Sequence, residues 1–292
     1  MLNADRICLG TVQLGLPYGI ANRGGQPDLP AAFSILDAAH QSGISLLDTS
    51  RAYGTSEEVI GSFAEKMGRS FQVISKLPPH PNCSRLSVSG FLKESLTRLR
   101  APFLQGYLIH DFKTYRDHPE VWDFLLGLKN DHLVKQVGFS VYFPREVELF
   151  LAQGICPDIV QIPFSVLDTR FAPLLSELKQ RSVEVHARSV FLQGAVFLPE
   201  EKLTGALQKA AASIRRLREL SSQTGVPVLD LCLRFVVAHE TIDRIVLGVD
   251  SAAHLRTNVA ALGNPFEDSA LSAELRQLAV NEEKVVVPSL WT

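Results

Sequence analysis

The sequence lacks the patterns that mark metal-binding and disulfide-rich proteins. It contains four cysteines, which are widely scattered and form no Cys-x-x-Cys pair. Its histidines show none of the spacings that are typical of zinc ligands. We therefore expect no metal site, and we expect buried, reduced thiols at the three cysteines that lie within or beside apolar runs.

Charge of one sign and long hydrophobic runs are also missing. The chain has 29 basic and 31 acidic residues with no run of like charge, which argues against nucleic acid or an anionic membrane as a partner. No apolar stretch approaches the ~20 residues that a membrane helix needs. The N-terminal run MLNADRICLG lacks the order of charged and apolar regions of a signal peptide. We expect a cytoplasmic, soluble protein.

No Gly-x-Gly-x-x-Gly motif is present, which argues against a Rossmann-type dinucleotide site. What the sequence does contain is a repeated alternation of short apolar runs with helix-like segments. The eight predicted strands are Ile7–Leu9, Ile44–Leu47, Phe71–Ser75, Gly106–Ile109, Val134–Phe139, Asp158–Ile162, Val183–Ala187 and Arg244–Leu247.

These strands are apolar on both faces, as parallel strands covered by helices should be. Helices between successive strands favour right-handed crossovers, which close eight parallel strands into a (β/α)8 TIM barrel. The length of 292 residues suits a barrel of roughly 250 residues with additions. No low-complexity linker divides the chain, so we expect one domain over residues 1–292.

Local signals predict several helix boundaries. Thr55 and Glu58 form a capping-box pattern at the start of the helix after the second strand. The connection between the seventh and eighth strands is the longest, and it contains helical patterns at Ala206–Thr224 and Val228–Ala238. We therefore expect an elaborated connection after the seventh strand, and an extra C-terminal helix at Leu271–Lys284 outside the barrel.

The residues at the carboxyl ends of the strands carry the functional information, because active sites of such barrels lie at that face. Seven of the eight strand ends are polar, although the strands themselves are apolar. The residues at these ends, in strand order, are Thr11, Asp48, Lys76, His110, Ser140, Gln161, Arg188 with Ser189, and Gly248.

Four side chains form a set that suits the reduction of a carbonyl group, which needs a hydride on carbon and a proton on oxygen. Tyr53 follows Asp48 by five residues and is the proton donor in this interpretation. The ammonium of Lys76 would stabilise the phenolate, and Asp48 would hold that ammonium in place. His110 would orient the substrate oxygen by a hydrogen bond.

Each of these residues also has a structural interpretation. Asp48 could cap a turn, Lys76 could be a solvated residue at the barrel rim, and Tyr53 could be a packed loop aromatic. His110 could pair with Asp111. The order of the four residues and their positions at strand ends favour the catalytic interpretation.

The segments LLDTSRAYGTSEEVIG, VISK and YLIHD resemble the aldo-keto reductase superfamily, whose catalytic tetrad is Asp, Tyr, Lys and His. Asp48, Tyr53, Lys76 and His110 occupy the four positions. The resemblance extends over nearly the whole chain, through LGTVQLG, VGFS, VQIPFSVLD, HARSVFLQG and LGVDSAAHLRTNVAAL. It implies an NAD(P)H-dependent reductase with a small-molecule carbonyl substrate.

The resemblance also implies which residues bind the cofactor. Ser140 and Gln161 would orient the nicotinamide ring, Ser251 would seat the pyrophosphate, and Asn258 would meet the adenine. The implied cofactor residues are Thr11, Ser140, Gln161, Arg188, Ser189, Gly248, Ser251, His254 and Asn258.

The chain departs from the family pattern at several positions. Val141 stands where the family usually has Asn, and Arg188 replaces the aromatic residue that stacks on the nicotinamide. In the strand-eight segment, Asp250 would disfavour a 2′-phosphate if it points inward, whereas His254 and Arg256 could accept one. The resemblance favours NADP(H) because the superfamily mostly uses it, and NAD(H) is the alternative.

The substrate is open at this level. The run GTVQLGLPYGIAN resembles a bacterial branch associated with carbohydrate metabolism, which implies a sugar or sugar derivative. Tyr18 in this run could contact substrate or belong to a plain surface loop. Two other functions are a non-catalytic nicotinamide-binding regulatory protein of the same fold, and a lyase or isomerase acting on a phosphorylated sugar. The intact tetrad weighs against both.

Overall fold

The eight strands form a closed, parallel barrel in which each strand pairs with the next and β8 pairs with β1. This arrangement comes from a computed structural model that describes residues 4–79, 83–262 and 269–291. The strands are β1 (Ile7–Gly10), β2 (Leu46–Asp48), β3 (Gln72–Leu77), β4 (Leu104–Ile109), β5 (Val134–Ser140), β6 (Ile159–Pro163), β7 (Glu184–Arg188) and β8 (Arg244–Gly248).

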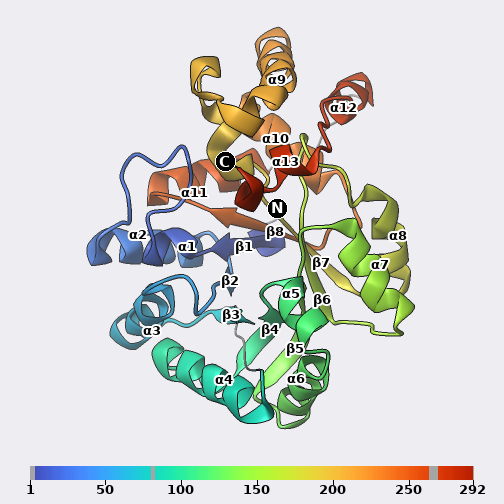
Figure 1. The fold of residues 1–292 in the computed structure, drawn as a ribbon. Helices are drawn as coiled ribbons and strands as arrows, with labels where there is room; N and C mark the ends of the chain where they lie inside the picture. The colour runs from blue at the N-terminus through green and yellow to red at the C-terminus, as the bar shows by residue number, and fades with distance from the viewer. Residues whose placement is uncertain (1–3, 80–82, 263–268, 292) are drawn as a thin grey trace.

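Helices surround the barrel as an outer ring (Figure 1). The α-helices are α1 (Val12–Gly15), α2 (Leu29–Gln41), α3 (Ser56–Met67), α4 (Arg85–Leu99), α5 (Phe112–Asp117), α6 (Val121–Asn130), α7 (Pro144–Ala152), α8 (Ala172–Gln180), α9 (Ala211–Thr224), α10 (Val228–Val237), α11 (Ala252–Ala261), α12 (Ser269–Arg276) and α13 (Glu283–Val286). The 3₁₀ helices are η1 (Ala4–Arg6), η2 (Leu192–Phe197), η3 (Glu200–Lys202), η4 (Gly205–Ala210) and η5 (Pro288–Leu290).

The predicted (β/α)8 barrel is confirmed, and every predicted strand ends within two residues of an observed one. The elaborated connection after β7 is also present. It contains η2, η3, η4, α9 and α10, so the predicted helix at Ala206–Thr224 begins as a 3₁₀ turn and becomes α-helical at Ala211. None of the described helices is long and apolar enough to cross a membrane.

Two local predictions are wrong. The capping box does not form, because Thr55 has φ −89° and ψ 8°, outside the extended region of an N-cap, and its hydroxyl lies 3.2 Å from Gln26 Nε2. Glu58 instead lies near Arg98. The single C-terminal helix is two helices, α12 and α13, and Asn281 between them has a φ of +54°.

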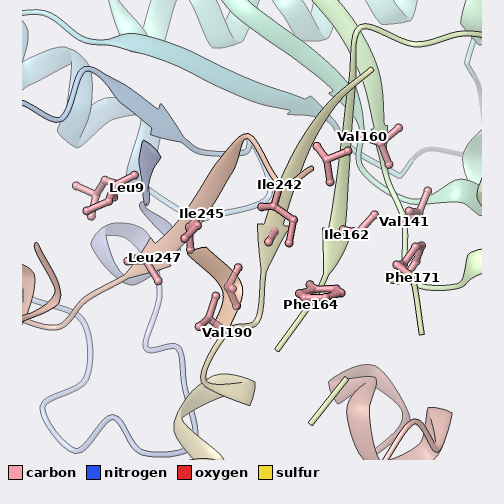
Figure 2. Close-up of a cluster of buried hydrophobic side chains, with 14 of the residues drawn as sticks. Leu9, Val141, Val160, Ile162, Phe164, Phe171, Val190, Ile242, Ile245 and Leu247 are labelled. Atoms are coloured by element: carbon pink, nitrogen blue, oxygen red, sulfur yellow. The ribbon is translucent and has the colours of Figure 1, made fainter. Parts of the chain in front are cut away.

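The core has two layers that the barrel wall separates. The outer layer packs the strands against the helices, and Figure 2 shows the part of it around β6, β7 and β8. The inner layer fills the barrel with one side chain from each of five strands, and Val246 of β8 packs against it. Its members are Cys8, Leu46, Ile74, Leu108 and Ile159.

This inner layer explains where the site lies. Side chains alternate between the two faces of a strand, so a residue two positions beyond an inner-layer residue also points into the barrel. Asp48 follows Leu46 by two positions, and Lys76 follows Ile74 in the same way. The same spacing relates His110 to Leu108 and Gln161 to Ile159. Four polar side chains therefore stand directly above an apolar plug, towards the carboxyl ends of the strands.

Candidate active site

The centre of the site is a buried ion pair between Asp48 and Lys76. Lys76 Nζ lies 2.7 Å from each carboxylate oxygen of Asp48 and donates to the Thr49 carbonyl at 2.9 Å. Gln161 Nε2 also donates to Asp48, at 2.8 Å. The remaining neighbour of Lys76 Nζ is the Tyr53 hydroxyl, at 3.4 Å. The sequence therefore predicted correctly that these residues meet.

His110 lies against the same tyrosine. The rings of Tyr53 and His110 meet edge to face, with their centroids 5.7 Å apart. His110 Nδ1 lies 3.1 Å from Ser50 Oγ, and Ser50 Oγ accepts a hydrogen bond from the backbone N–H of Ala52 at 3.1 Å. Since Ser50 accepts from Ala52, its own hydrogen can point at His110 Nδ1. The hydrogen bond with Ser50 thereby fixes the orientation of the ring.

The environment shifts the protonation of these groups. Burial raises the pKa of Tyr53 above its usual range, and the opposing effect of Lys76 is smaller. The expected stabilisation of the phenolate by Lys76 is present, but desolvation of the buried phenol has the larger effect on the pKa of Tyr53. Burial opposes a charge on Lys76, but Asp48 raises the pKa of its ammonium above the usual range. Burial, Lys76 and Arg188 lower the pKa of His110 to about 3.

A cavity of about 510 Å³ opens above this cluster. Most of the predicted site residues line it. Lys76 does not, because it lies fully buried behind Asp48 and Tyr53, and Ser251 does not, because its hydroxyl accepts the His254 N–H as the N-cap of α11. The predicted residues that line the cavity are Thr11, Asp48, Tyr53, His110, Ser140, Gln161, Arg188, Ser189, Gly248, His254 and Asn258.

Thr11 makes structural hydrogen bonds that the sequence did not predict. Its hydroxyl donates to the Asp48 carbonyl at 2.9 Å and lies 2.9 Å from Ser56 Oγ, which also bonds the Thr11 carbonyl. These bonds tie the end of β1 to the end of β2 and to the start of α3. The turn that carries Tyr53 is thereby held at both ends, since Tyr53 lies between Asp48 and Ser56.

Arg188 stacks on a tyrosine that the sequence analysis did not single out. Its guanidinium lies 4.0 Å from the centre of the Tyr142 ring, and its Nη2 donates to the Val141 carbonyl at 2.9 Å. The two positions where the chain departs from the family pattern, Val141 and Arg188, are therefore in direct contact. The expected stacking of Arg188 on a nicotinamide ring stays a prediction.

Two loops meet over the mouth of the cavity. Gln193 Nε2 lies 3.0 Å from the Tyr18 hydroxyl, and the N–H of Ile20 donates to the Gln193 carbonyl at 3.1 Å. Tyr18 and Gln193 both line the cavity, so the loop after β1 is more than a plain surface loop. Whether Tyr18 contacts substrate stays a prediction.

Comparisons with known proteins agree on one family. The sequence model of the Aldo/keto reductase family matches residues 6–276. The chain belongs to this family. As an aldo/keto reductase, it is an NAD(P)H-dependent oxidoreductase of carbonyl compounds.

Individual relatives are distant. The chain is 22% identical over 252 residues to an uncharacterized oxidoreductase, YqkF, of Bacillus subtilis, covering 79% of this chain and 81% of that one. It is 25% identical over 181 residues to the aldo-keto reductase YhdN of the same organism, covering 57% and 52%. The holo form of aldo-keto reductase AKR11C1 from Bacillus halodurans has the same fold, with a TM-score of 0.80 at 20% identity over 95% and 93% of the chains.

The residues of this aldo/keto reductase fit a nicotinamide cofactor. Gln13 lines the cavity, and its buried Oε1 has no partner in the described part of the chain. A side chain on Gly248 would come within 2.5 Å of the Gln13 amide, so a glycine there preserves the space. The first turn of α11, whose N-cap is Ser251, offers backbone N–H groups that suit a pyrophosphate. Ser140 and Gln161 would hold the carboxamide.

Ser50, Tyr142 and Gln13 are the residues that sequence reasoning missed. Ser50 stands within the run DTSRAY, between two members of the tetrad, and Tyr142 stands two positions after Ser140. Both positions carried a detectable signal, since each lies two residues after a strand-end residue that the sequence had already placed in the site. Gln13 follows β1 in LGTVQLG and had no such signal.

Proposed function

We propose that this aldo/keto reductase reduces an aldehyde or ketone with Tyr53 as the proton donor. The observation that carries the proposal is the short chain of contacts from Asp48 through Lys76 Nζ to the Tyr53 hydroxyl, at 2.7 and 3.4 Å, at the wall of a cavity. The bound dihydronicotinamide supplies the hydride to the carbonyl carbon. The protein must then supply the proton to the oxygen.

Tyr53 enters the reaction in the protonated state that a proton donor needs, because burial raises its pKa above the ordinary value. As its Oη gives up the proton, the ammonium of Lys76 faces the developing phenolate at hydrogen-bond distance. Asp48 keeps that ammonium charged and aimed at Tyr53. Burial alone would disfavour the negative charge of the phenolate, but the ammonium of Lys76 stabilises this charge as it forms.

His110 orients the carbonyl oxygen as a neutral donor. Its pKa is lowered to about 3, so the ring carries no charge at neutral pH. When Ser50 donates to Nδ1, the ring hydrogen is on Nε2. A neutral Nε2–H donates to the carbonyl oxygen without competing with Tyr53 as the acid.

For the substrate we propose a sugar or a sugar derivative. The part of the cavity nearest the mouth offers hydrogen-bonding side chains, Tyr18 and Gln193, rather than a purely apolar wall. Such a lining suits hydroxyl-bearing substrates, whose polar groups need partners on burial. The family resemblance favours NADP(H) as cofactor, with NAD(H) as the alternative, and the charges at the far end of the cavity bear on this choice.

The proposal is tested by supplying the purified protein with NADH or NADPH and a panel of short aldehydes and aldoses, and by following cofactor absorbance. We expect aldehyde-dependent oxidation of the cofactor. Tight cofactor binding with no turnover on any carbonyl would instead identify a regulatory protein of the same fold. A protein that binds neither cofactor but converts a phosphorylated sugar would be a lyase or isomerase.

A further inference from the structure

The cavity has two chemically different ends. The catalytic end contains Tyr53 and His110, and the nicotinamide must lie there because it reacts there. A dinucleotide is long, so its adenosine must lie at the opposite end. That end is formed by the residues after β8 and by the first turns of α11, including Asp250, His254 and Asn258.

One face of α11 borders the cavity and another faces solvent. His254 and Asn258, which are four residues apart, line the cavity. Arg256 does not line it and is exposed, as are Ala253 and Ala260, which are three and four residues from it. Arg256 therefore belongs to the solvent face of α11. The sequence alone had left open whether Arg256 could accept a 2′-phosphate.

Positive charge is scarce around the cavity. Among the described residues that line it, Arg188 is the only lysine or arginine. Arg188 belongs to the catalytic end, since it stacks on Tyr142 and its charge contributes to the low pKa of His110. No arginine or lysine of the described cavity wall is therefore available at the adenosine end.

Negative charge is present at that end instead. Asp250 lines the cavity directly after β8 and makes no ion pair or side-chain hydrogen bond within the described part of the chain. NADPH differs from NADH by one phosphate on the 2′-oxygen of the adenosine ribose. A phosphate monoester carries close to two negative charges at neutral pH, so it needs a cationic partner, whereas an acidic side chain suits a free 2′-hydroxyl.

We propose that Asp250 makes this enzyme select NADH over NADPH. The carboxylate accepts a hydrogen bond from the ribose hydroxyls of NADH and repels the 2′-phosphate of NADPH. This assignment rests on the proposed function only in requiring that a nicotinamide cofactor occupies the cavity. It differs from the preference that the family resemblance implies, because that preference depends on cationic side chains that this cavity wall lacks.

Calorimetric titration of the protein with NADH and with NADPH tests the assignment by binding alone. Both titrations are made at pH 8. We expect NADH to bind at least about tenfold more tightly, equivalent to about 1.4 kcal/mol. Equal affinities, or tighter binding of NADPH, would overturn the assignment and leave the proposed function standing. Binding of neither cofactor would overturn both.

Two variants test whether Asp250 causes the preference for NADH. Asp250→Ser removes the carboxylate from an exposed position, and we expect the preference for NADH to shrink about tenfold, mainly through tighter NADPH binding. Arg256→Ala is the matched control on the solvent face of α11 and should leave the ratio of the two affinities unchanged. An unchanged ratio in Asp250→Ser, or a loss of NADPH affinity in Arg256→Ala, would show that Asp250 is not the selecting residue.

Discussion

Gly15 and Tyr53 are in backbone contact, although they lie 38 positions apart in the chain. A methyl group on Gly15 would come within 1.8 Å of the Tyr53 carbonyl oxygen and 2.5 Å of the Ser56 amide nitrogen. Gly54, directly after Tyr53, has a φ of +54° and meets the Gly15 carbonyl in the same way. The position of the proposed proton donor is thus set by two glycines that pack directly on each other.

This contact predicts that Gly15→Ala impairs catalysis without touching the substrate. The added methyl must push the Tyr53 turn away from α1, and a displacement near 1 Å of a catalytic group costs about a hundredfold in rate. We expect kcat to fall by about that factor. Gly90→Ala in α4 is the control, since an added methyl there meets nothing within 4 Å and kcat should not change. Normal kcat in Gly15→Ala would contradict the positioning role.

The pKa of His110 predicts how stability depends on pH. An unfolded chain protonates this histidine near pH 6.5, whereas the folded protein does so only near pH 3. Between these values the unfolded state binds the extra proton, so the free energy of unfolding falls as pH drops below about 6.5. Denaturant unfolding from pH 8 to pH 5 should show this decline, and His110→Gln should make it shallower. Titration of the His110 ring near pH 6.5 by NMR would contradict the account.

Glu184 lies at the other end of the barrel from the site, because it is the first residue of β7. His186 Nε2 lies 2.9 Å from its carboxylate and Gln136 Nε2 donates at 3.0 Å. The bond with His186 is the main cause that lowers the pKa of Glu184 to about 2. Its contribution to stability is present above about pH 4.5 and is lost as pH falls towards 2.

Glu184→Gln should therefore lower the free energy of unfolding at pH 7 by about 1 kcal/mol, a small value because solvent partly screens the group. The loss should shrink as pH falls towards 2, where the wild-type carboxylate becomes half protonated, and kcat should be unaffected. Glu148→Gln, on the exposed side of α7, is the control and should change neither quantity. Equal losses in the two variants would show that the network around Glu184 contributes nothing.

Arg188 should make the catalytic end favour anionic substrates. Its guanidinium makes no ion pair in the described part of the chain, and it lines the same cavity as Tyr53 and His110. An aldehyde that carries a carboxylate can therefore pair with it. We expect Arg188→Met to lower kcat/KM about tenfold more for 4-carboxybenzaldehyde than for benzaldehyde. Equal losses on the two aldehydes would assign Arg188 to general positioning.

The barrel could be predicted from the sequence because apolar runs and helical segments alternate eight times. The strand ends could be predicted for the same reason, since a polar residue after a short, continuous apolar run marks the point where the barrel interior meets solvent. The absence of the capping box at Thr55 could not be predicted from the sequence. Its backbone conformation depends on the packing of the preceding turn against Gly15, which is a contact distant in sequence.

The site was predictable to the extent that strand order brings residues together. Asp48, Lys76 and His110 lie at the carboxyl ends of consecutive strands, so their meeting followed from topology. The contacts that orient them did not follow, because the bond between Ser50 and His110 depends on ring rotation. The stacking of Arg188 on Tyr142 likewise depends on rotamers that no spacing rule fixes.

The most direct measurement is the single-turnover rate of aldehyde reduction by the Tyr53→Phe variant at saturating NADH, followed by stopped flow. Loss of a general acid should slow this step by about 10²- to 10⁴-fold, while the Kd for NADH stays that of the wild type. Tyr107→Phe is the matched control, since it removes a buried hydroxyl of β4 that has no partner in the described part of the chain, and its rate should be normal. A Tyr53→Phe rate equal to that of the wild type would contradict the account.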